Sequence, residues 1–160
     1  MSSQVLREQS LGAQAFVSLL RAHMAATRQL NAQLNAAHGL TLSDFEVLLR
    51  LARAPDRRMR RVDLAGEVLL TASGVTRLLE GLERQGFVER ASCDSDRRVV
   101  YAVVTDTGLA KLREAASTHF AEVEELFGGR YEERELSELA ALLARLGGDE
   151  PGACETPEDV

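Results

Sequence analysis

The most restrictive feature of this 160-residue sequence is a pair of short helical segments with almost no chain between them. Apolar residues at three- and four-residue spacing predict one helix at about 62–69 and a second at about 72–85, which Gly86 ends. A gap of two or three residues is typical of a helix-turn-helix, in which the second helix packs across the first. The residues expected to face the core from the second helix are Val75, Leu78, Leu79 and Leu82.

Two short strands follow this pair of helices. Residues 87–90 and the β-branched run 99–104 predict a hairpin, joined by a polar loop that contains Asp94-Ser95-Asp96-Arg97-Arg98. Two strands are marginal on their own in water, so we expect the hairpin to pack against the helices. The fold class predicted here is mainly α with a small β-hairpin.

Longer helices are predicted on both sides of this block. Thr41 to Asp44 supply capping residues for the second helix of the chain, and Pro55 ends it. A basic loop, Arg57-Arg58-Met59-Arg60-Arg61, follows. The other predicted segments are helices at 11–37, 43–54, about 105–126 and about 132–146, and a disordered acidic tail at 147–160.

The net charge of −6 conceals an uneven distribution along the chain. Residues 99–160 hold five cationic and fourteen acidic side chains, whereas residues 57–98 hold nine arginines and seven acids. The middle of the chain is therefore locally basic, which matters because exposed charges are screened beyond about 8 Å at physiological salt. No apolar run approaches the ~20 residues that span a bilayer, and no basic-then-apolar leader is visible at residues 1–4. We therefore expect a cytoplasmic protein that does not enter a membrane.

One face of the predicted helix at 72–85 suits the major groove of DNA. Ser73, Thr76 and Arg77 share that face, where hydroxyls bind phosphates or base edges and a guanidinium binds guanine. Arg97 and Arg98 near the hairpin tip would enter or flank a minor groove, with Asp96 orienting them. The alternative is an ordinary solvated helix face and a polar turn. Arg57, Arg58, Arg60 and Arg61 are further candidates for phosphate contacts.

Order and spacing of these motifs resemble the MarR family of bacterial transcriptional regulators. The resemblance covers about residues 10–146 and is carried by the stretch from Leu64 to Arg90, Asp96-Arg97-Arg98, Val104-Thr105-Asp106-Thr107-Gly108 and His38-Gly39-Leu40-Thr41. It implies a winged helix-turn-helix lobe at 40–105, with residues 10–37 and 107–146 forming a helical dimerisation region within a single domain at 1–160.

Function, partners and a ligand site follow from this resemblance as expectations. A homodimer would bind a pseudo-palindromic operator on double-stranded DNA at the nucleoid and repress its own or a neighbouring gene. A small anionic, often phenolic, effector would release it from DNA. The pocket for this effector would lie between the dimer helices and the DNA-binding lobe, and the candidate residues are His23, Thr27, Phe45, Arg50 and His119.

The chain departs from the family pattern in three places. Leu69 stands where a turn glycine is common. Ala72 and Gly74 replace larger polar residues, which leaves more of the DNA readout to the remaining face. Cys93 stands where the hairpin loop commonly has aspartate, and Asp94 is a possible substitute.

Other functions find less support in the sequence. Cys93 could sense oxidants, because nearby arginines would stabilise its thiolate, although an incidental exposed cysteine is the simpler interpretation. The three histidines lack metal-ligand spacing, and no phosphate-binding loop or nucleophile motif is present, so we expect no metal, no cofactor and no enzyme activity. The alternative function is a helical dimeric module for protein or ligand binding that has lost operator binding.

Overall fold

A computed structural model describes residues 10–68, 72–92 and 98–147. The chain runs through α1 (Leu11–His38), α2 (Leu42–Arg53), a 3-10 turn η1 (Pro55–Arg57), β1 (Arg58–Arg60), α3 (Arg61–Glu67), α4 (Ala72–Arg84), β2 (Val88–Ser92), β3 (Val100–Val104), α5 (Asp106–Gly128) and α6 (Glu133–Gly147). The predicted helices are confirmed with ends shifted by at most two residues. Of the tail predicted at 147–160, Gly147 is instead the last residue of α6, and the rest lies outside the described residues.

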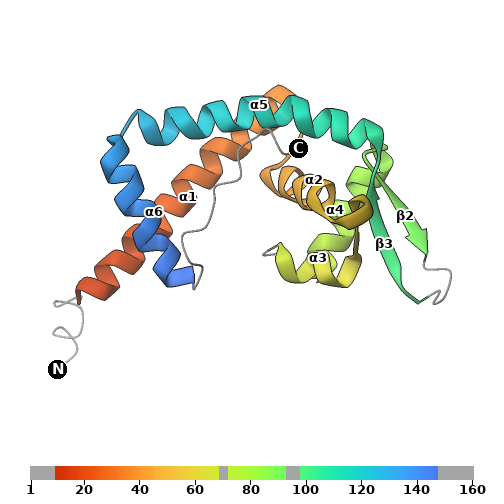
Figure 1. Ribbon diagram of the computed structural model, residues 1–160, viewed down its shortest axis with the longest axis horizontal. Coiled ribbons are helices and arrows are strands. Elements are labelled where there is room, and N and C mark those ends of the chain that lie inside the picture. Colours follow the sequence, from red (N-terminus) through yellow and green to blue (C-terminus); the bar gives the residue numbers. More distant parts are fainter. Residues whose placement is uncertain (1–9, 69–71, 93–97, 148–160) are drawn as a thin grey trace.

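The molecule has two parts that α5 connects (Figure 1). The lobe comprises α2, α3, α4 and the three strands. The arm comprises α1, the second half of α5 and α6. Figure 1 shows α5 crossing above both parts, with α1 and α6 descending on the side opposite the strands. The hydrophobic core lies in the lobe and extends to the adjoining segments of α1 and α5 through Leu34, Leu109 and Leu112.

Local sequence signals define the ends of the helices. Thr41 caps α2 in a capping box: its hydroxyl accepts from the Asp44 N–H at 3.1 Å, and its own N–H donates to the Asp44 carboxylate at 2.8 Å. Gly39 ends α1 and Gly86 follows α4 with φ of 67° and 74°, a conformation that glycine adopts without strain. The core-facing residues predicted for α4 are confirmed, since Val75, Leu79 and Leu82 are buried and Leu78 is partly buried against the core.

The sheet differs from the prediction by one strand. Residues 58–60, expected in a basic loop, form β1, which pairs antiparallel with β3 in the order β1-β3-β2. Within β1, Met59 packs on the core while Arg58 and Arg60 are exposed. A three-residue segment rich in arginine carries almost no strand signal in its sequence, and its structure depends on the partner that β3 provides.

The junction between α4, β2 and α5 is held by a close backbone contact. The Thr105 hydroxyl accepts from the Gly108 N–H at 3.0 Å and donates to the Gly86 carbonyl at 2.7 Å. The Thr105 N–H donates to the Phe87 carbonyl at 3.0 Å. Gly108 is buried against that carbonyl, which leaves no room for a side chain. The first turn of α5 is therefore fixed against Gly86 and Phe87, which follow α4.

We predict that Gly108→Ala destabilises the fold. The added Cβ would overlap the Phe87 carbonyl oxygen and lie 2.9 Å from Val104 Cγ2. Overpacking of this kind costs about 1–3 kcal/mol of unfolding free energy, measurable by urea denaturation at fixed protein concentration. Gly81→Ala is the matched control, because nothing lies within 4 Å of its Cβ position and alanine stabilises a helix interior by roughly 0.5–1 kcal/mol. Equal stability of the two variants would contradict the prediction.

Candidate nucleic-acid interface

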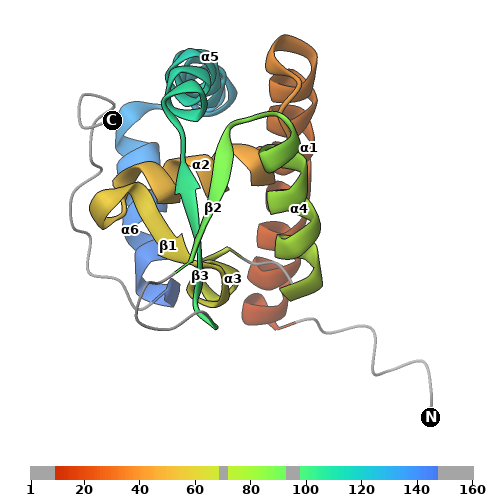
Figure 2. The same ribbon diagram turned by 90° about the vertical axis from the view of Figure 1, so that its right-hand side faces the viewer.

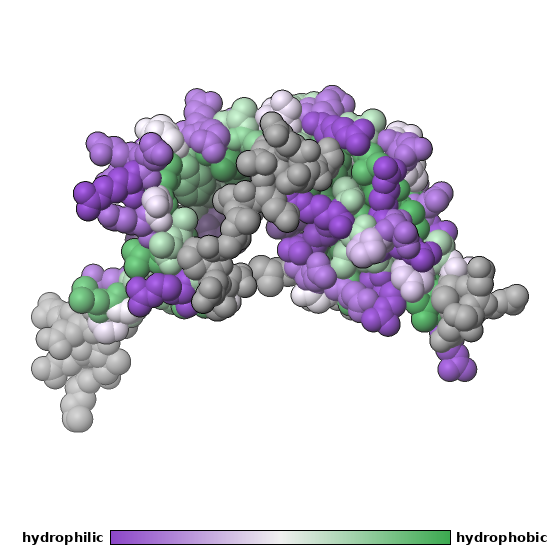
Figure 3. Space-filling model, in the orientation of Figure 1, coloured by the Kyte–Doolittle hydropathy of each residue, from purple (hydrophilic) through white to green (hydrophobic). Residues whose placement is uncertain are grey.

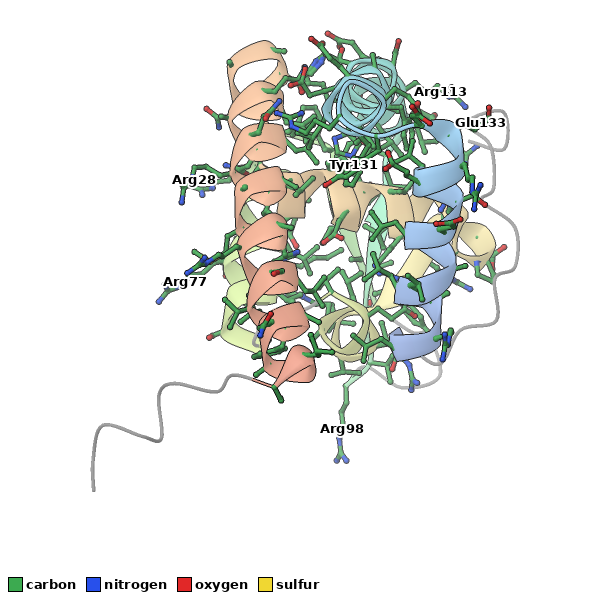
Figure 4. All side chains as sticks on the ribbon, turned by 90° about the vertical axis from the view of Figure 1, so that its left-hand side faces the viewer. Arg28, Arg77, Arg98, Arg113, Tyr131 and Glu133 are labelled. Atoms are coloured by element: carbon green, nitrogen blue, oxygen red, sulfur yellow. The ribbon has the colours of Figure 1, made fainter. Side chains whose placement is uncertain are left out.

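The outward face of α4 presents the polar residues that the sequence singled out. Ser73, Thr76 and Arg77 are exposed, while Val75 and Leu79 on the opposite face are buried. Figure 4 shows Arg77 extending from α4 into open space. In the described part of the chain, Arg77 forms no ion pair with an acidic side chain. Its guanidinium is therefore presented to the solvent.

The β2–β3 hairpin forms the second projecting element. Its base is anchored by buried Val88, Ala102 and Val104, and register pairs Val88 with Val104 and Ser92 with Val100. Arg98 is exposed beside the start of β3 and points away from the body (Figure 4). Asp96, Arg97 and Cys93 lie outside the described residues.

An ion pair connects these two elements. Arg90 Nε on β2 donates to both carboxylate oxygens of Glu83 on the last turn of α4, at 2.9 and 2.8 Å. This hydrogen bond and the charge of Glu83 raise the pKa of the Arg90 guanidinium above its ordinary value. The pairing was not predicted, since the two residues lie seven positions apart on different elements and their charges alone do not show which residues pair.

The arginines at 57–61 lie on or next to β1 rather than on α4, and three of them pair with acids. Arg57 pairs with Asp106 at 3.2 Å and Arg60 with Asp63 at 2.6 Å. Arg58 pairs with Asp56 and lies over the Tyr101 ring at 5.0 Å. Figure 2 shows β1 and α4 on opposite sides of β3. These pairs offset the charges within the lobe, and a role in phosphate contacts stays a prediction for Arg57, Arg58, Arg60 and Arg61.

A cavity of about 630 Å³ opens beside β1. Of the five candidate ligand residues, Arg50 lines it and pairs with Glu67 on α3 at 3.0 Å. The other four are not among the lining residues, which are Glu46, Leu49, Arg50, Arg53, Ala54, Pro55, Arg58, Met59, Arg60, Asp63, Glu67 and Tyr101. The cavity thus lies within the lobe, between α2, β1 and α3.

The remaining ligand candidates are distributed between the arm and the core. Phe45 and His119 are buried with ring centroids 4.6 Å apart. Burial lowers the pKa of His119, and the charge of Glu46 partly opposes this shift. His23 is exposed on α1, and Thr27 is half-buried one turn further along. These four residues stay candidates for a ligand site between lobe and arm.

His38 lies where the end of α1 meets α5. It is the last residue of α1, and its Nε2 lies 2.9 Å from Thr118 Oγ1 on α5.

Within the described ranges no three His, Cys, Asp or Glu residues come together as a metal site. None of the described helices has the length and hydropathy of a membrane span.

The arrangement of α3, α4 and the β2–β3 hairpin is that of a winged helix-turn-helix protein. Comparison with known proteins agrees with this class. The family model for MarR proteins matches residues 38–99. The HTH-type transcriptional regulator MhqR of Bacillus subtilis is 30% identical over 133 residues, which cover 82% of this chain and 88% of MhqR.

Solved structures give the same assignment over nearly the whole chain. AbsC, a MarR family transcriptional regulator from Streptomyces coelicolor, is 31% identical with a TM-score of 0.77, covering 89% of this chain and 96% of AbsC. Sco3205, a MarR family transcriptional regulator of the same organism solved in complex with DNA, is 27% identical with a TM-score of 0.79. The match covers 88% of this chain and 89% of Sco3205. The chain belongs to the MarR family of helix-turn-helix transcriptional regulators, and its relatives are regulators rather than enzymes.

Proposed function

We propose that this regulator binds operator DNA with α4 in the major groove and the β2–β3 wing against the adjacent minor groove. The exposed polar face of α4, with Arg77 extended from it, is the observation that carries the proposal. Hydroxyls of Ser73 and Thr76 reach phosphates or base edges, and the guanidinium of Arg77 binds guanine bidentately. The likeness to Sco3205, which was solved with DNA, supports the same mode. Bound at the nucleoid in the cytoplasm, the protein would repress its own or a neighbouring gene.

The distribution of charge is compatible with this orientation. In the described part of the C-terminal third, the acidic residues lie on α5, on α6 or between them, and α6 belongs to the arm. Within the lobe, several arginines are paired with acids, whereas Arg77 on α4 forms no ion pair with an acidic side chain among the described residues, so its positive charge is available to DNA. Because salt screens charges beyond about 8 Å, the acidic arm opposes this local attraction weakly.

We predict that Arg77→Ala weakens binding to the specific operator by about 1–3 kcal/mol and relaxes the preference at one base pair. The measurement is fluorescence anisotropy with duplexes that tile the DNA around the gene, followed by single base-pair substitutions in the bound site. Arg134→Ala on the exposed face of α6 serves as control, since it also removes one positive charge. A loss that is equal on all sequences would make Arg77 a phosphate contact instead.

A second copy of the chain would cover the apolar faces of the arm. Leu11 is 83%, Phe16 60% and Leu146 75% exposed, although long apolar side chains favour burial. Figure 3 shows apolar side chains at the surface of the descending arm. We propose that α1 and α6 of two copies pack together as a homodimer. Two α4 helices about 34 Å apart would then match a pseudo-palindromic operator.

We predict a dimeric mass at micromolar concentration in sedimentation velocity. Phe16→Asp places a charge on the exposed apolar face of α1 and should shift the mass toward the monomer, because burying an unpaired carboxylate costs several kcal/mol. Glu89→Ala on exposed β2 is the control and should stay dimeric. A monomeric wild type would contradict the dimer and, with it, palindrome recognition.

We also propose that a small anionic effector binds the cavity beside β1 and weakens DNA binding. Four arginines face three carboxylates there, above an apolar floor that includes Leu49 and Met59. Arg50 bridges α2 to Glu67 on α3. An anion that competes for Arg50 would loosen α3, which packs against α4 in the helix-turn-helix.

Salicylate is the probe for this effector site, with benzyl alcohol as its neutral counterpart. We predict that salicylate raises the melting temperature of the wild type but not of Arg50→Gln, since a ligand that binds the folded state stabilises it. Salicylate should also lower operator affinity in the wild type. A shift that Arg50→Gln retains would place the anion elsewhere, for example near His119 and Phe45.

A further inference from the structure

We propose that Glu83 is a positioning residue for DNA binding: its ion pair with Arg90 fixes the wing relative to the recognition helix. The inference rests on the proposed DNA-binding mode and assigns a role to two residues that the mode itself does not use. The contact is close: Arg90 Nε lies 2.9 and 2.8 Å from the two carboxylate oxygens of Glu83. Glu83 is 21% and Arg90 49% exposed at the side chain, so the pair is partly shielded from water.

The ion pair lies at the base of the wing, in the three-stranded part of the sheet, where Arg90 pairs with Ala102 and Ala102 pairs with Met59 of β1. At its base, the Phe87 N–H donates to the Leu82 carbonyl at 3.0 Å, and β3 is flanked by β1 along residues 101–103. Further out, where Ser92 pairs with Val100, β3 is no longer flanked by β1 and the hairpin has two strands only. A two-stranded ribbon twists easily, so its direction depends on what holds it at the base. The Glu83–Arg90 pair is the tie between α4 and β2 side chains at this position.

Electrostatics and positioning predict opposite signs for the loss of Glu83. Glu83 lies on the same side of α4 as Thr76 and Glu80, at three- and four-residue spacing. Removing a carboxylate from that side makes the surface more positive, which by itself strengthens DNA binding. If the carboxylate instead holds the wing in place through Arg90, its removal weakens binding. The direction of the change therefore separates the two roles.

The test compares Glu83→Ala with Glu80→Ala. Both substitutions remove one negative charge from α4 and introduce a good helix former. Among the described residues, Glu83 accepts the hydrogen bonds of Arg90, whereas the charge of Glu80 makes the smallest contribution to the raised pKa of Arg90. We expect Glu83→Ala to weaken operator binding by about five- to twentyfold in anisotropy, the size of a coupling between contacting groups. Glu80→Ala should bind as tightly as the wild type or more tightly. Equal or tighter binding by Glu83→Ala would overturn the proposal.

A double-mutant cycle with the wing links the effect to positioning. Arg98→Ala should weaken binding in the wild type and lower the salt slope by about one unit. In the Glu83→Ala background the same substitution should have a much smaller effect, because the wing is no longer held against its groove. An undiminished effect of Arg98→Ala would overturn the proposal, and so would a charge-swapped Glu83→Arg/Arg90→Glu protein that folds but recovers no affinity.

A measurement without DNA separates failure of this inference from failure of the proposed function. Amide hydrogen exchange of residues 88–92 and 100–104 should be faster in Glu83→Ala than in the wild type and unchanged in Glu80→Ala. Unchanged exchange in Glu83→Ala would reject the positioning role whatever the protein binds. If exchange is faster in Glu83→Ala but the wild-type protein binds no specific duplex, the coupling between α4 and the wing is retained and the DNA-binding mode is rejected.

Discussion

The structure depends most on the contact between the start of α5 and the turn after α4. Thr105 caps α5 and donates to the Gly86 carbonyl, and Gly108 leaves the space that the Phe87 carbonyl occupies. Arg57 adds an ion pair from the other side of the lobe to Asp106. Because α5 continues into the arm, these contacts determine how the lobe is held relative to the exposed apolar faces of α1 and α6. Any spacing between two recognition helices in a dimer is set from this junction outward.

Charge is used differently in the parts of the molecule. On the β1 side of the lobe, arginines are paired with nearby acids and line a cavity. On α4, Arg77 extends from the surface without an ion pair among the described residues. The Glu83–Arg90 pair joins α4 to β2. A protein of net charge −6 can therefore present a local cationic surface, since what DNA meets depends on which cations lack a nearby acid rather than on the total.

Much of the secondary structure was predictable because its signals are local. The apolar periodicity of α1, the capping box at Thr41 and the glycines that follow α1 and α4 each act over a few residues. The polar face of α4 was predictable for the same reason, since helical spacing places Ser73, Thr76 and Arg77 together. The strand β1 was not, because its pairing with residues 101–103 of β3 joins segments more than forty positions apart. The same distance in sequence concealed the pairing of Arg57 with Asp106.

The sequence by itself determined which segments are helical, where they end, which faces are apolar, and the family to which the chain belongs. These properties follow from residue type and short-range spacing. The tertiary structure decided which arginines are paired with acids. It also decided that Arg50 lines a cavity in the lobe while Phe45 and His119 are buried, and that Glu83 on α4 pairs with Arg90 on β2. Ion pairs and cavities require groups from separate elements to meet at a few ångströms, and only the packing of those elements sets these distances.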